Sequence, residues 1–321
     1  MPSKLRVLVL GANGFIGRAI LRYFSQDPRI QLLAGVRQGG KGLGEIEEVM
    51  LDANDLTAVE AACRRVDAII FSLAGKEAGM QRAISNVCAA TRSAVNRPLL
   101  IFLSSIAVYG PAYRLVNETS TLDPSVGGYG QLKIRSEELV RDLPRWLILR
   151  PGIVYGPGSE LWSTQIGRLV AAGKIDLARE EMTATCNAVY VDDLARCIHE
   201  LLFTDGAENN VFNVVGADAL DWNDFFRLHA ISLNVSWPAS SKPPMKRKLA
   251  RLVDSLAFTK YKALRALGIG GAAPPPILRP WLTDQCRQGP SVDSSAVRKL
   301  LSMSWTAVDV GVAQSVLRSS G

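Results

Sequence analysis

Histidine is scarce in this sequence, and the cysteines follow no metal-binding pattern. Only two of the 321 residues are histidines, His199 and His229, and neither has a cysteine at the spacing usual for zinc. The five cysteines are odd in number, scattered and never spaced C-x-x-C. They are Cys63, Cys88, Cys186, Cys197 and Cys286. We therefore expect no metal site, and reduced thiols in a cytoplasmic protein.

Long apolar runs and nucleic-acid-binding modules are missing as well. No apolar run approaches the ~18 residues that a membrane-spanning helix needs. The net charge of +7 comes largely from residues 242–265, and no aromatic platform accompanies these cations, so we expect no nucleic-acid partner. Apolar residues recur in this segment at near-helical spacing, which favours a helix packed on a substrate domain. Contact with a membrane surface through the segment is the alternative.

The N-terminal half alternates short apolar runs with longer amphipathic stretches. The apolar runs read LRVLVLG, IQLLAGVR, VDAIIFSLAG and PLLIFLSS. Continuous apolar strands between helices predict a parallel sheet covered on both faces. The predicted fold class is α/β, a Rossmann-type doubly wound sheet with a smaller, discontinuous C-terminal substrate domain.

Proline and glycine clusters suggest where the chain divides. They lie at residues 151–158, 237–244 and 268–276, which makes the second half rich in loops. We expect a dinucleotide-binding domain at residues 1–155 and a mainly substrate-binding domain at 156–321. A segment around 186–205 is expected to fold back onto the first domain.

Three glycines separate the first predicted strand from the first predicted helix. In VLVLGANGFIGR they are Gly11, Gly14 and Gly17. Glycine allows a tight turn and lets the backbone approach a pyrophosphate, whose charge then rests on the amide groups of a helix N-terminus. The pattern is G-x-x-G-x-x-G, and its place at the first strand-to-helix junction predicts a dinucleotide site.

The end of the second predicted strand bears on the choice of dinucleotide. An acidic residue there accepts a hydrogen bond from the ribose 2′-hydroxyl of NAD. This strand closes with Arg37 instead, and a cation suits the 2′-phosphate of NADP. The sequence favours NADP, with NAD as the alternative. Asp52, after the next strand, either reaches the adenine amino group or caps the following turn.

A tyrosine and a lysine follow two serines further along the chain. Ser104 and Ser105 end an apolar strand, where ligands bind in open α/β sheets. In YGQLK the four-residue spacing places Tyr129 and Lys133 on one face of a helix. A nearby ammonium lowers the pKa of a phenol, so Tyr129 can exchange a proton with a substrate oxygen that Ser105 holds.

These motifs together give the sequence a specific resemblance. It resembles the extended short-chain dehydrogenases/reductases, the NAD-dependent epimerase/dehydratase family, over roughly residues 5–230. The matching motifs, in the family's order, are GANGFIGR (11–18), FSLAG (71–75), Asn86-Val87, SSIAVYG (104–110), YGQLK (129–133), RPGIVYGPG (150–158) and VYVDDLA (189–195).

The resemblance assigns roles to four residues. It implies that Tyr129 is the acid/base, and that Lys133 binds the nicotinamide ribose and lowers the tyrosine pKa. It also implies that Ser105 contacts the substrate and that Asn86 supports the active-site helix. The full set expected at the cofactor is Gly11, Asn13, Gly14, Phe15, Ile16, Gly17, Arg37, Asp52, Leu73, Ala74, Tyr129, Lys133 and Pro151. Members of the family often dimerise through helices beside the sheet, so a homodimer is an expectation too.

Departures from the family pattern narrow the reaction. Its nucleotide-sugar dehydratases carry Asp-Glu after the catalytic hydroxyl, where this chain has Ile106 and Ala107, so dehydration is not expected. Many of its nucleotide-sugar epimerases carry asparagine where Ile153 stands. We expect an NAD(P)-dependent oxidoreductase that interconverts a secondary alcohol and a ketone. The alternatives are a nucleotide-sugar 4-epimerase with tightly held NAD and a non-catalytic NAD(P)-binding module.

Overall fold

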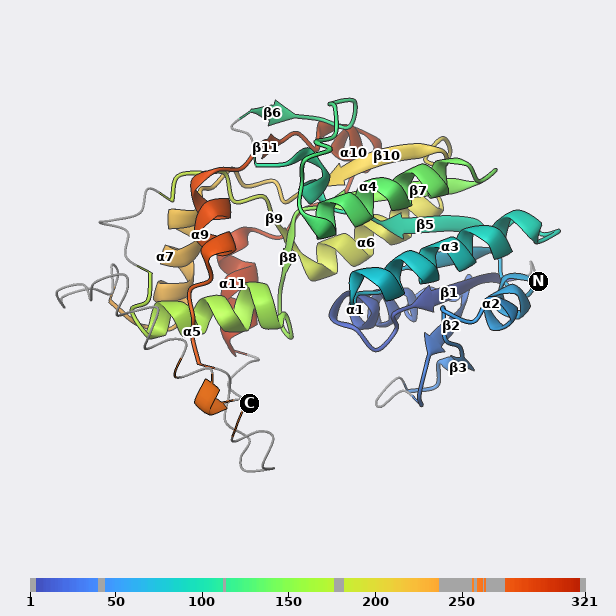
Figure 1. Ribbon diagram of the computed structural model, residues 1–321, viewed down its shortest axis with the longest axis horizontal. Helices are drawn as coiled ribbons and strands as arrows, with labels where there is room; N and C mark the ends of the chain where they lie inside the picture. The colour runs from blue at the N-terminus through green and yellow to red at the C-terminus, as the bar shows by residue number, and fades with distance from the viewer. Residues whose placement is uncertain are drawn as a thin grey trace.

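A seven-stranded sheet is the main element of the computed structural model, which describes residues 4–39, 44–111, 114–175, 182–236, 256, 259–261, 263 and 275–317. The strand order is β10-β7-β5-β4-β1-β2-β3, and every neighbouring pair is parallel (Figure 1). The strands are β1 (Leu5–Leu10), β2 (Ile30–Val36), β3 (Glu47–Met50), β4 (Ala68–Phe71), β5 (Leu99–Leu103), β7 (Trp146–Pro151) and β10 (Asn210–Val214). The predicted α/β fold class is confirmed.

Helices cover both faces of this sheet. One face carries α1 (Phe15–Phe24), α6 (Val191–Leu202) and α10 (Ser295–Leu300), and the other carries α2 (Leu56–Cys63), α3 (Glu77–Ser93) and α4 (Gly128–Arg141). Strand β1 shows why both faces need a cover, because successive side chains of a strand point to opposite faces of the sheet. Val7 and Val9 pack into the core on the first face, while Leu8 and Leu10 pack into the core on the second. Each such buried aliphatic side chain stabilises the fold by roughly 1.5–3 kcal/mol.

The strand order reverses at β1, and this reversal positions the site. Strand β1 pairs with β2 on one side and with β4 on the other, so the helical connections leave the sheet in opposite directions. A crevice therefore opens beyond the carboxyl ends of β1 and β4, where open α/β sheets bind their ligands.

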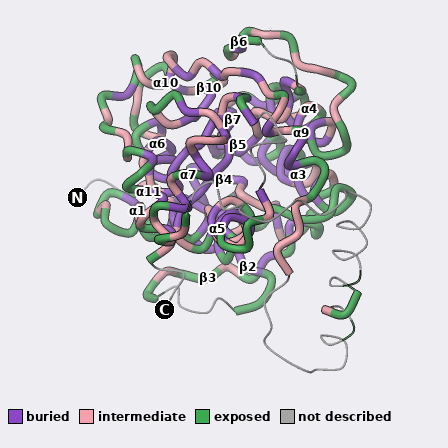
Figure 2. The backbone as a smooth tube through the Cα atoms, turned by 90° about the vertical axis from the view of Figure 1, so that its left-hand side faces the viewer, coloured by how far each residue is buried: buried purple, intermediate pink, exposed green. Residues whose placement is uncertain are grey.

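A second part of the molecule packs around its own core. It contains the parallel pair β8 (Ile153–Tyr155) and β9 (Ala188–Tyr190), the π-helix η2 (Glu160–Thr164), and the helices α5 (Gln165–Ala171), α7 (Trp222–Ser232), α9 (Pro280–Arg287) and α11 (Val308–Leu317). Two short strands, β6 (Leu115–Val116) and β11 (Ser291–Val292), pair at one end. The purple buried segments in Figure 2 run through both parts.

Elements from beyond residue 155 also return to the large sheet. Strand β10 pairs with β7, and α6 packs against α1, where His199 Nε2 lies 2.9 Å from an Asp27 carboxylate oxygen. The expected domain division at residue 155 stays a prediction. Of the basic segment 242–265, only residues 256, 259–261 and 263 lie within the described part of the chain.

The described residues offer neither a membrane span nor a metal cluster. No helix among them is long and apolar enough to cross a membrane. Within the same described part, no group of three or more His, Cys, Asp or Glu side chains is placed to hold a metal ion. All five cysteines are buried and none of them forms a disulfide, and burial raises the pKa of the Cys63 thiol to about 11.

Candidate active site

The glycine turn after β1 is packed too tightly for side chains. Gly11 has φ +89°, and a Cβ there would lie 2.8 Å from the carbonyl oxygen of Ser72. A Cβ on Gly17 would lie 2.1 Å from the carbonyl oxygen of Gly11. Helix α1 begins after Gly14 with no side-chain cap and no acidic residue in its first turn. Its N-terminal amide groups therefore suit the pyrophosphate of a dinucleotide.

The other predicted cofactor residues lie around this turn or at the same edge of the sheet. The carbonyl of Asn13 accepts a hydrogen bond from Arg18 Nε at 3.1 Å, and Phe15 and Ile16 pack on the core beneath α1. Leu73 and Ala74 follow β4, and the Leu73 amide lies 3.0 Å from where a Gly11 Cβ would be. Pro151 ends β7.

Arg37 and Asp52 lie near one another beyond β2 and β3, and both are exposed. An Asp52 oxygen accepts hydrogen bonds from the Asn54 backbone at 2.9 Å and its side chain at 3.1 Å. These bonds lower the pKa of Asp52, and the charge of Arg37 adds to the effect. Asp52 was predicted either to reach the adenine amino group or to cap the following turn, and these two hydrogen bonds are those of a turn cap.

Asn86 lies on α3 and points toward this cofactor-side loop. Its amide donates to the carbonyl of Ala53 at 3.1 Å, in the loop between β3 and α2. The hydrogen bond therefore fixes the loop that carries Asp52. The resemblance implied that Asn86 supports the active-site helix, and that role stays a prediction.

Ser105, Tyr129 and Lys133 lie together beyond the end of β5. Ser105 precedes the 3₁₀ helix η1 (Ile106–Tyr109), and its hydroxyl accepts from the Ala107 amide at 3.2 Å. Tyr129 lies in the first turn of α4, is 54% exposed, and lies close enough to Ser105 for that hydroxyl to affect the tyrosine pKa. Lys133 Nζ lies 5.7 Å from the Tyr129 ring centroid and donates to the Leu103 carbonyl at 2.6 Å.

The pKa values of the tyrosine and the lysine follow from burial. Lys133 is 5% exposed, and burial lowers its pKa to about 8, while the carboxylate of Glu137 opposes the change. Burial raises the pKa of Tyr129, and its hydrogen bond with Ser105 partly offsets the rise. Solvent limits this rise because the residue is half exposed. The expected lowering of the Tyr129 pKa by Lys133 is therefore not seen in this structure.

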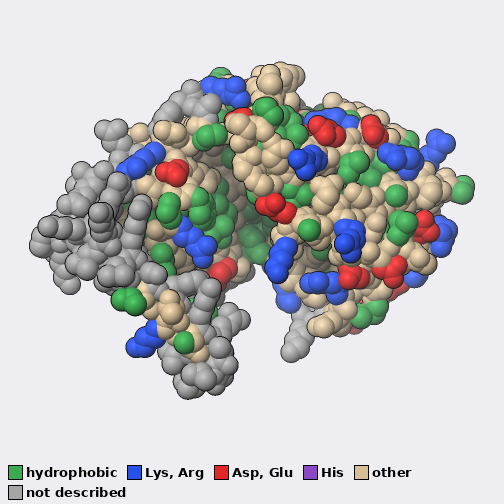
Figure 3. All heavy atoms as spheres, viewed as in Figure 1, with side chains coloured by type: hydrophobic (Ala, Val, Ile, Leu, Met, Phe, Trp, Pro, Cys, Tyr) green, Lys and Arg blue, Asp and Glu red, His purple; other side chains and the backbone are tan. Residues whose placement is uncertain are grey.

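The neighbouring serine has a different environment. Ser104 is 3% exposed, and its hydroxyl donates to Glu137 at 2.6 Å. That leaves Ser105 as the hydroxyl beside Tyr129. Figure 3 shows the surface hollowed between the two parts of the molecule.

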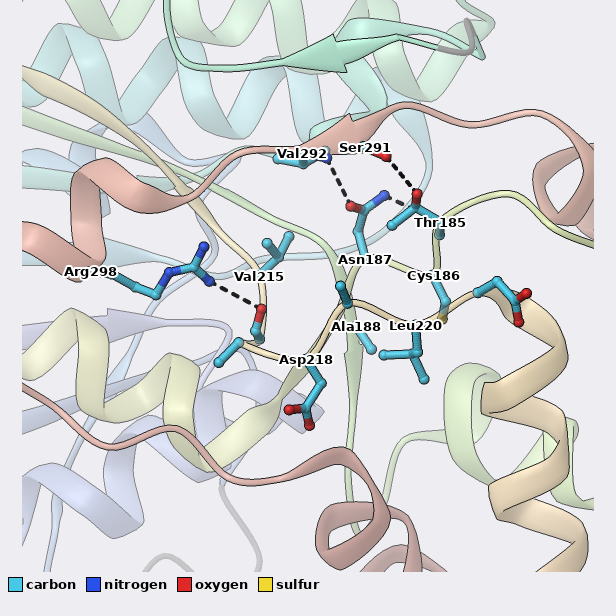
Figure 4. Close-up of a pocket in the computed structure, with 14 residues that line it drawn as sticks. Thr185, Cys186, Asn187, Ala188, Val215, Asp218, Leu220, Ser291, Val292 and Arg298 are labelled. Carbon is cyan, nitrogen blue, oxygen red and sulfur yellow. Dashed lines mark hydrogen bonds between the residues drawn. The ribbon is translucent and has the colours of Figure 1, made fainter.

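A cavity of about 330 Å³ lies at the same edge of the sheet, beyond β10 (Figure 4). None of the predicted site residues lines it. Its polar groups bond to one another: Arg298 donates to the Gly216 carbonyl at 3.3 Å, and Thr185 and Ser291 share a hydrogen bond of 2.6 Å. Asn187 accepts from the Val292 amide at 3.1 Å. The first contact joins α10 to the segment after β10, and the other two join the segment before β9 to β11.

Sequence reasoning missed two charged residues beneath the site, Glu137 and Arg150. They are 0% and 1% exposed and form a two-pronged ion pair. A signal was present for each: an arginine interrupts the apolar run WLILRP, and the glutamate follows Lys133 by one helical turn.

Comparisons with known proteins identify the family of the chain. The model of the NAD dependent epimerase/dehydratase family matches residues 7–215, more than half of the chain. The 2′-dehydrokanamycin reductase of Streptomyces kanamyceticus is 26% identical over 71% of this chain and 66% of its own length. A subunit of NADH dehydrogenase, alpha subcomplex subunit 9 of Dictyostelium discoideum, is 23% identical over 70% of this chain and 62% of its own length. The chain thus spans less than two thirds of both curated relatives.

Solved structures share the fold. The UDP-glucuronic acid 4-epimerase of Bacillus cereus superposes with a TM-score of 0.72 at 17% identity, over 98% of this chain and 99% of its own. The UDP-glucose 4-epimerase of Thermotoga maritima gives 0.69 at 16% identity, over 98% and 99%. At such identities the likeness establishes the architecture alone.

Proposed function

Because the chain belongs to the NAD-dependent epimerase/dehydratase family, we propose that it is an oxidoreductase that interconverts a secondary alcohol and a ketone, with NADP as its cofactor. The observation that supports this most directly is the cluster of Ser105, Tyr129 and Lys133. It lies beyond β5, beside the crevice that suits the dinucleotide.

The chemistry of the three side chains fits this reaction. A bound nicotinamide supplies or accepts the hydride at the carbon atom of the substrate. In the direction of reduction, the Tyr129 hydroxyl gives its proton to the substrate oxygen, and solvent returns a proton to the phenolate. Ser105 donates a hydrogen bond to the same oxygen and stabilises its developing charge.

Lys133 supports the tyrosine from beneath. One of its three N–H groups is used by the Leu103 carbonyl, which leaves two for other partners. A ribose hydroxyl of the cofactor is the partner that we propose for them. We propose that Lys133, a cation at this distance from the ring, stabilises the phenolate that forms during the reaction, although the pKa of the resting tyrosine is raised.

The proposal of NADP depends on Arg37. It directly follows β2, is exposed, and lies close enough to Asp52 to lower the pKa of that carboxyl. A guanidinium there can hold a 2′-phosphate by charge-assisted hydrogen bonds. No carboxylate takes that position, as NAD recognition would favour.

The second candidate is a nucleotide-sugar 4-epimerase with tightly held NAD. It would use the same residues, and the solved epimerases have this fold. Ile153 in place of the asparagine common in such epimerases counts against it. A non-catalytic role is the third reading, in line with the respiratory-complex subunit among the relatives, but it would leave the catalytic cluster without use.

Mass spectrometry of nucleotide retained after native purification tests the proposal first. Protein stripped of any nucleotide is then titrated with NADPH and NADH. Empty protein that binds NADPH more tightly supports a dissociable co-substrate and a reductase. Retained NAD with weak NADPH binding would favour the epimerase. Failure to bind either dinucleotide would contradict both.

A further inference from the structure

Glu137 is a fully buried carboxylate with four hydrogen-bond donors around it. Arg150 donates from Nε at 2.9 Å and from Nη2 at 2.7 Å. Ser104 donates its hydroxyl at 2.6 Å, and Arg141 donates from Nη2 at 2.9 Å. Arg150 also donates to the hydroxyl of Tyr109 at 2.8 Å. The carboxylate is therefore the centre of a satisfied polar network inside the protein.

The network joins the elements that carry the reacting groups. Glu137 lies one helical turn after Lys133 and two after Tyr129, on the same face of α4. Its partner Ser104 directly precedes Ser105. Its partner Arg150 directly precedes Pro151 at the end of β7. One side chain thus bonds to α4, to the end of β5 and to the end of β7.

Stability alone is a weak reason for such an arrangement. Removing two charges from water costs about as much as their attraction returns, and a packed apolar pair of the same size would hold these elements as well. A buried carboxylate beside Lys133 does something that an apolar residue cannot do, because it favours the charged form of the amine.

We propose that Glu137 is a positioning residue for the reaction proposed above: it holds the segment of Ser105 and the helix of Lys133 in place beside Tyr129, and it places a negative charge one helical turn from the Lys133 amine. The inference rests on the proposed function. Glu137 acts through its neighbours, since its oxygens are occupied by Ser104, Arg141 and Arg150.

Other charged and titratable groups surround this part of the site. From α4 these are Tyr129 and Arg141, and from the neighbouring elements they are Arg150 of β7, Tyr109 of η1, Glu118 of the loop after β6, and Glu77 of α3. Among these charges, that of Glu137 is the one that raises the pKa of Lys133 against the effect of burial.

The sign of the expected change follows from the charges. With Glu137 present, the pKa of Lys133 is about 8. Loss of a negative charge one helical turn away disfavours the ammonium, so the pKa of Lys133 falls further below its ordinary value. This change moves the alkaline limb of the pH–rate profile to lower pH.

The test uses Glu137→Gln, which removes the charge and keeps the size. Since this change leaves Arg150 without its charged partner, the double variant Glu137→Gln/Arg150→Met is made beside it. Either folded variant is expected to show the alkaline limb of kcat about one pH unit or more below that of the wild type. Glu137→Asp, which restores the charge, is expected to move the limb back.

A matched control lies at the other end of β7. There Arg145 makes the same two-pronged pair with Glu208, at 3.0 and 2.6 Å. Glu208→Gln is expected to leave the pH profile unchanged, because this pair lies at the edge of the sheet away from the reacting groups. A shift of equal size in the control would mean that any lost ion pair disturbs the profile, and would overturn the inference.

An activity-independent measurement separates this inference from the proposed function. The titration of Lys133 is followed by NMR of labelled lysine side chains, with assignment by Lys133→Arg. A lower pKa in the folded Glu137 variants supports the inference even if the wild type reduces no ketone, which would contradict the proposed function alone. An unchanged Lys133 pKa and an unchanged alkaline limb in the folded double variant would overturn it.

Discussion

At the scale of single residues, the site depends on which hydroxyl can exchange a proton. Ser104 is buried and bonded to Glu137, whereas Ser105 bonds with Tyr129. Tyr129 is half exposed, so a substrate can reach its phenol from solvent. Its pKa is raised, which favours the protonated form that a general acid needs.

Tyr129→Phe tests the assignment of that acid. It removes one hydroxyl and little binding surface, so we expect kcat to fall by roughly 10²–10⁴-fold while the Kd for NADPH stays nearly unchanged. Turnover and a fluorescence titration of the cofactor measure the two quantities. Near-wild-type turnover in a folded variant would show that Tyr129 is not the acid.

Arg37→Asp tests the assignment of the dinucleotide. A carboxylate at the end of β2 repels a 2′-phosphate and can accept from a 2′-hydroxyl, so the preference for NADPH over NADH should fall by at least about tenfold. Arg227→Asp, an equal change of charge on α7, serves as the control. If the ratio of the Kd values for NADPH and NADH in both variants equals that of the wild type, Arg37 does not bind the 2′-phosphate.

Residues whose roles depend on local spacing were predictable from the sequence, and those that depend on long-range contacts were not. The glycines of the turn and the tyrosine–lysine pair act within one turn or one helix. Glu137 draws its role from Ser104 and Arg150, which lie 33 and 13 residues away. Asn86 bonds to a residue 33 positions away, and no local pattern shows which one.

At the scale of elements, the start of α1 is fixed by steric contact with the turn before it. A Cβ on Gly17 would meet backbone atoms of Gly11 and Ala12, which cannot move aside as a flexible side chain can. The first turn of the helix thereby lies directly against the turn after β1. Its amide groups keep the position that a pyrophosphate requires.

Gly17→Ala should therefore damage both stability and cofactor binding. We expect the free energy of unfolding to fall by about 1–3 kcal/mol, as for other overpacked sites, and the affinity for NADPH to fall with it. Gly79→Ala is the matched control, because a Cβ at that position in α3 meets nothing within 4 Å and alanine favours a helix. Urea unfolding of both variants measures the difference, and equal effects would argue against this contact.

At the scale of the whole molecule, the alternation of apolar runs and helices was enough to predict a parallel, doubly wound sheet. The runs became β1, β2, β4 and β5, each covered on both faces. The way in which the last part of the chain returns was harder to foresee. Strand β10 and helix α10 join the large sheet, while α7, α9 and α11 build a separate core. Contacts between residues far apart in the sequence decide whether a late segment joins the large sheet or the separate core. The spacing of apolar residues within the segment therefore says little about it.

A dinucleotide that lies across the edge of this sheet should stabilise the molecule as a whole. Ligand that binds only the folded state raises the free energy of unfolding by about 2.7 kcal/mol at a concentration of 100 Kd. We expect NADPH to raise Tm more than NADH does at equal concentration, since Arg37 discriminates between them. The thermal shift is measured for the wild type and for Arg37→Asp. A larger Tm shift with NADH than with NADPH in the wild type would favour the epimerase, because that reaction needs a retained NAD. Equal Tm shifts with the two dinucleotides would mean that Arg37 does not discriminate between them.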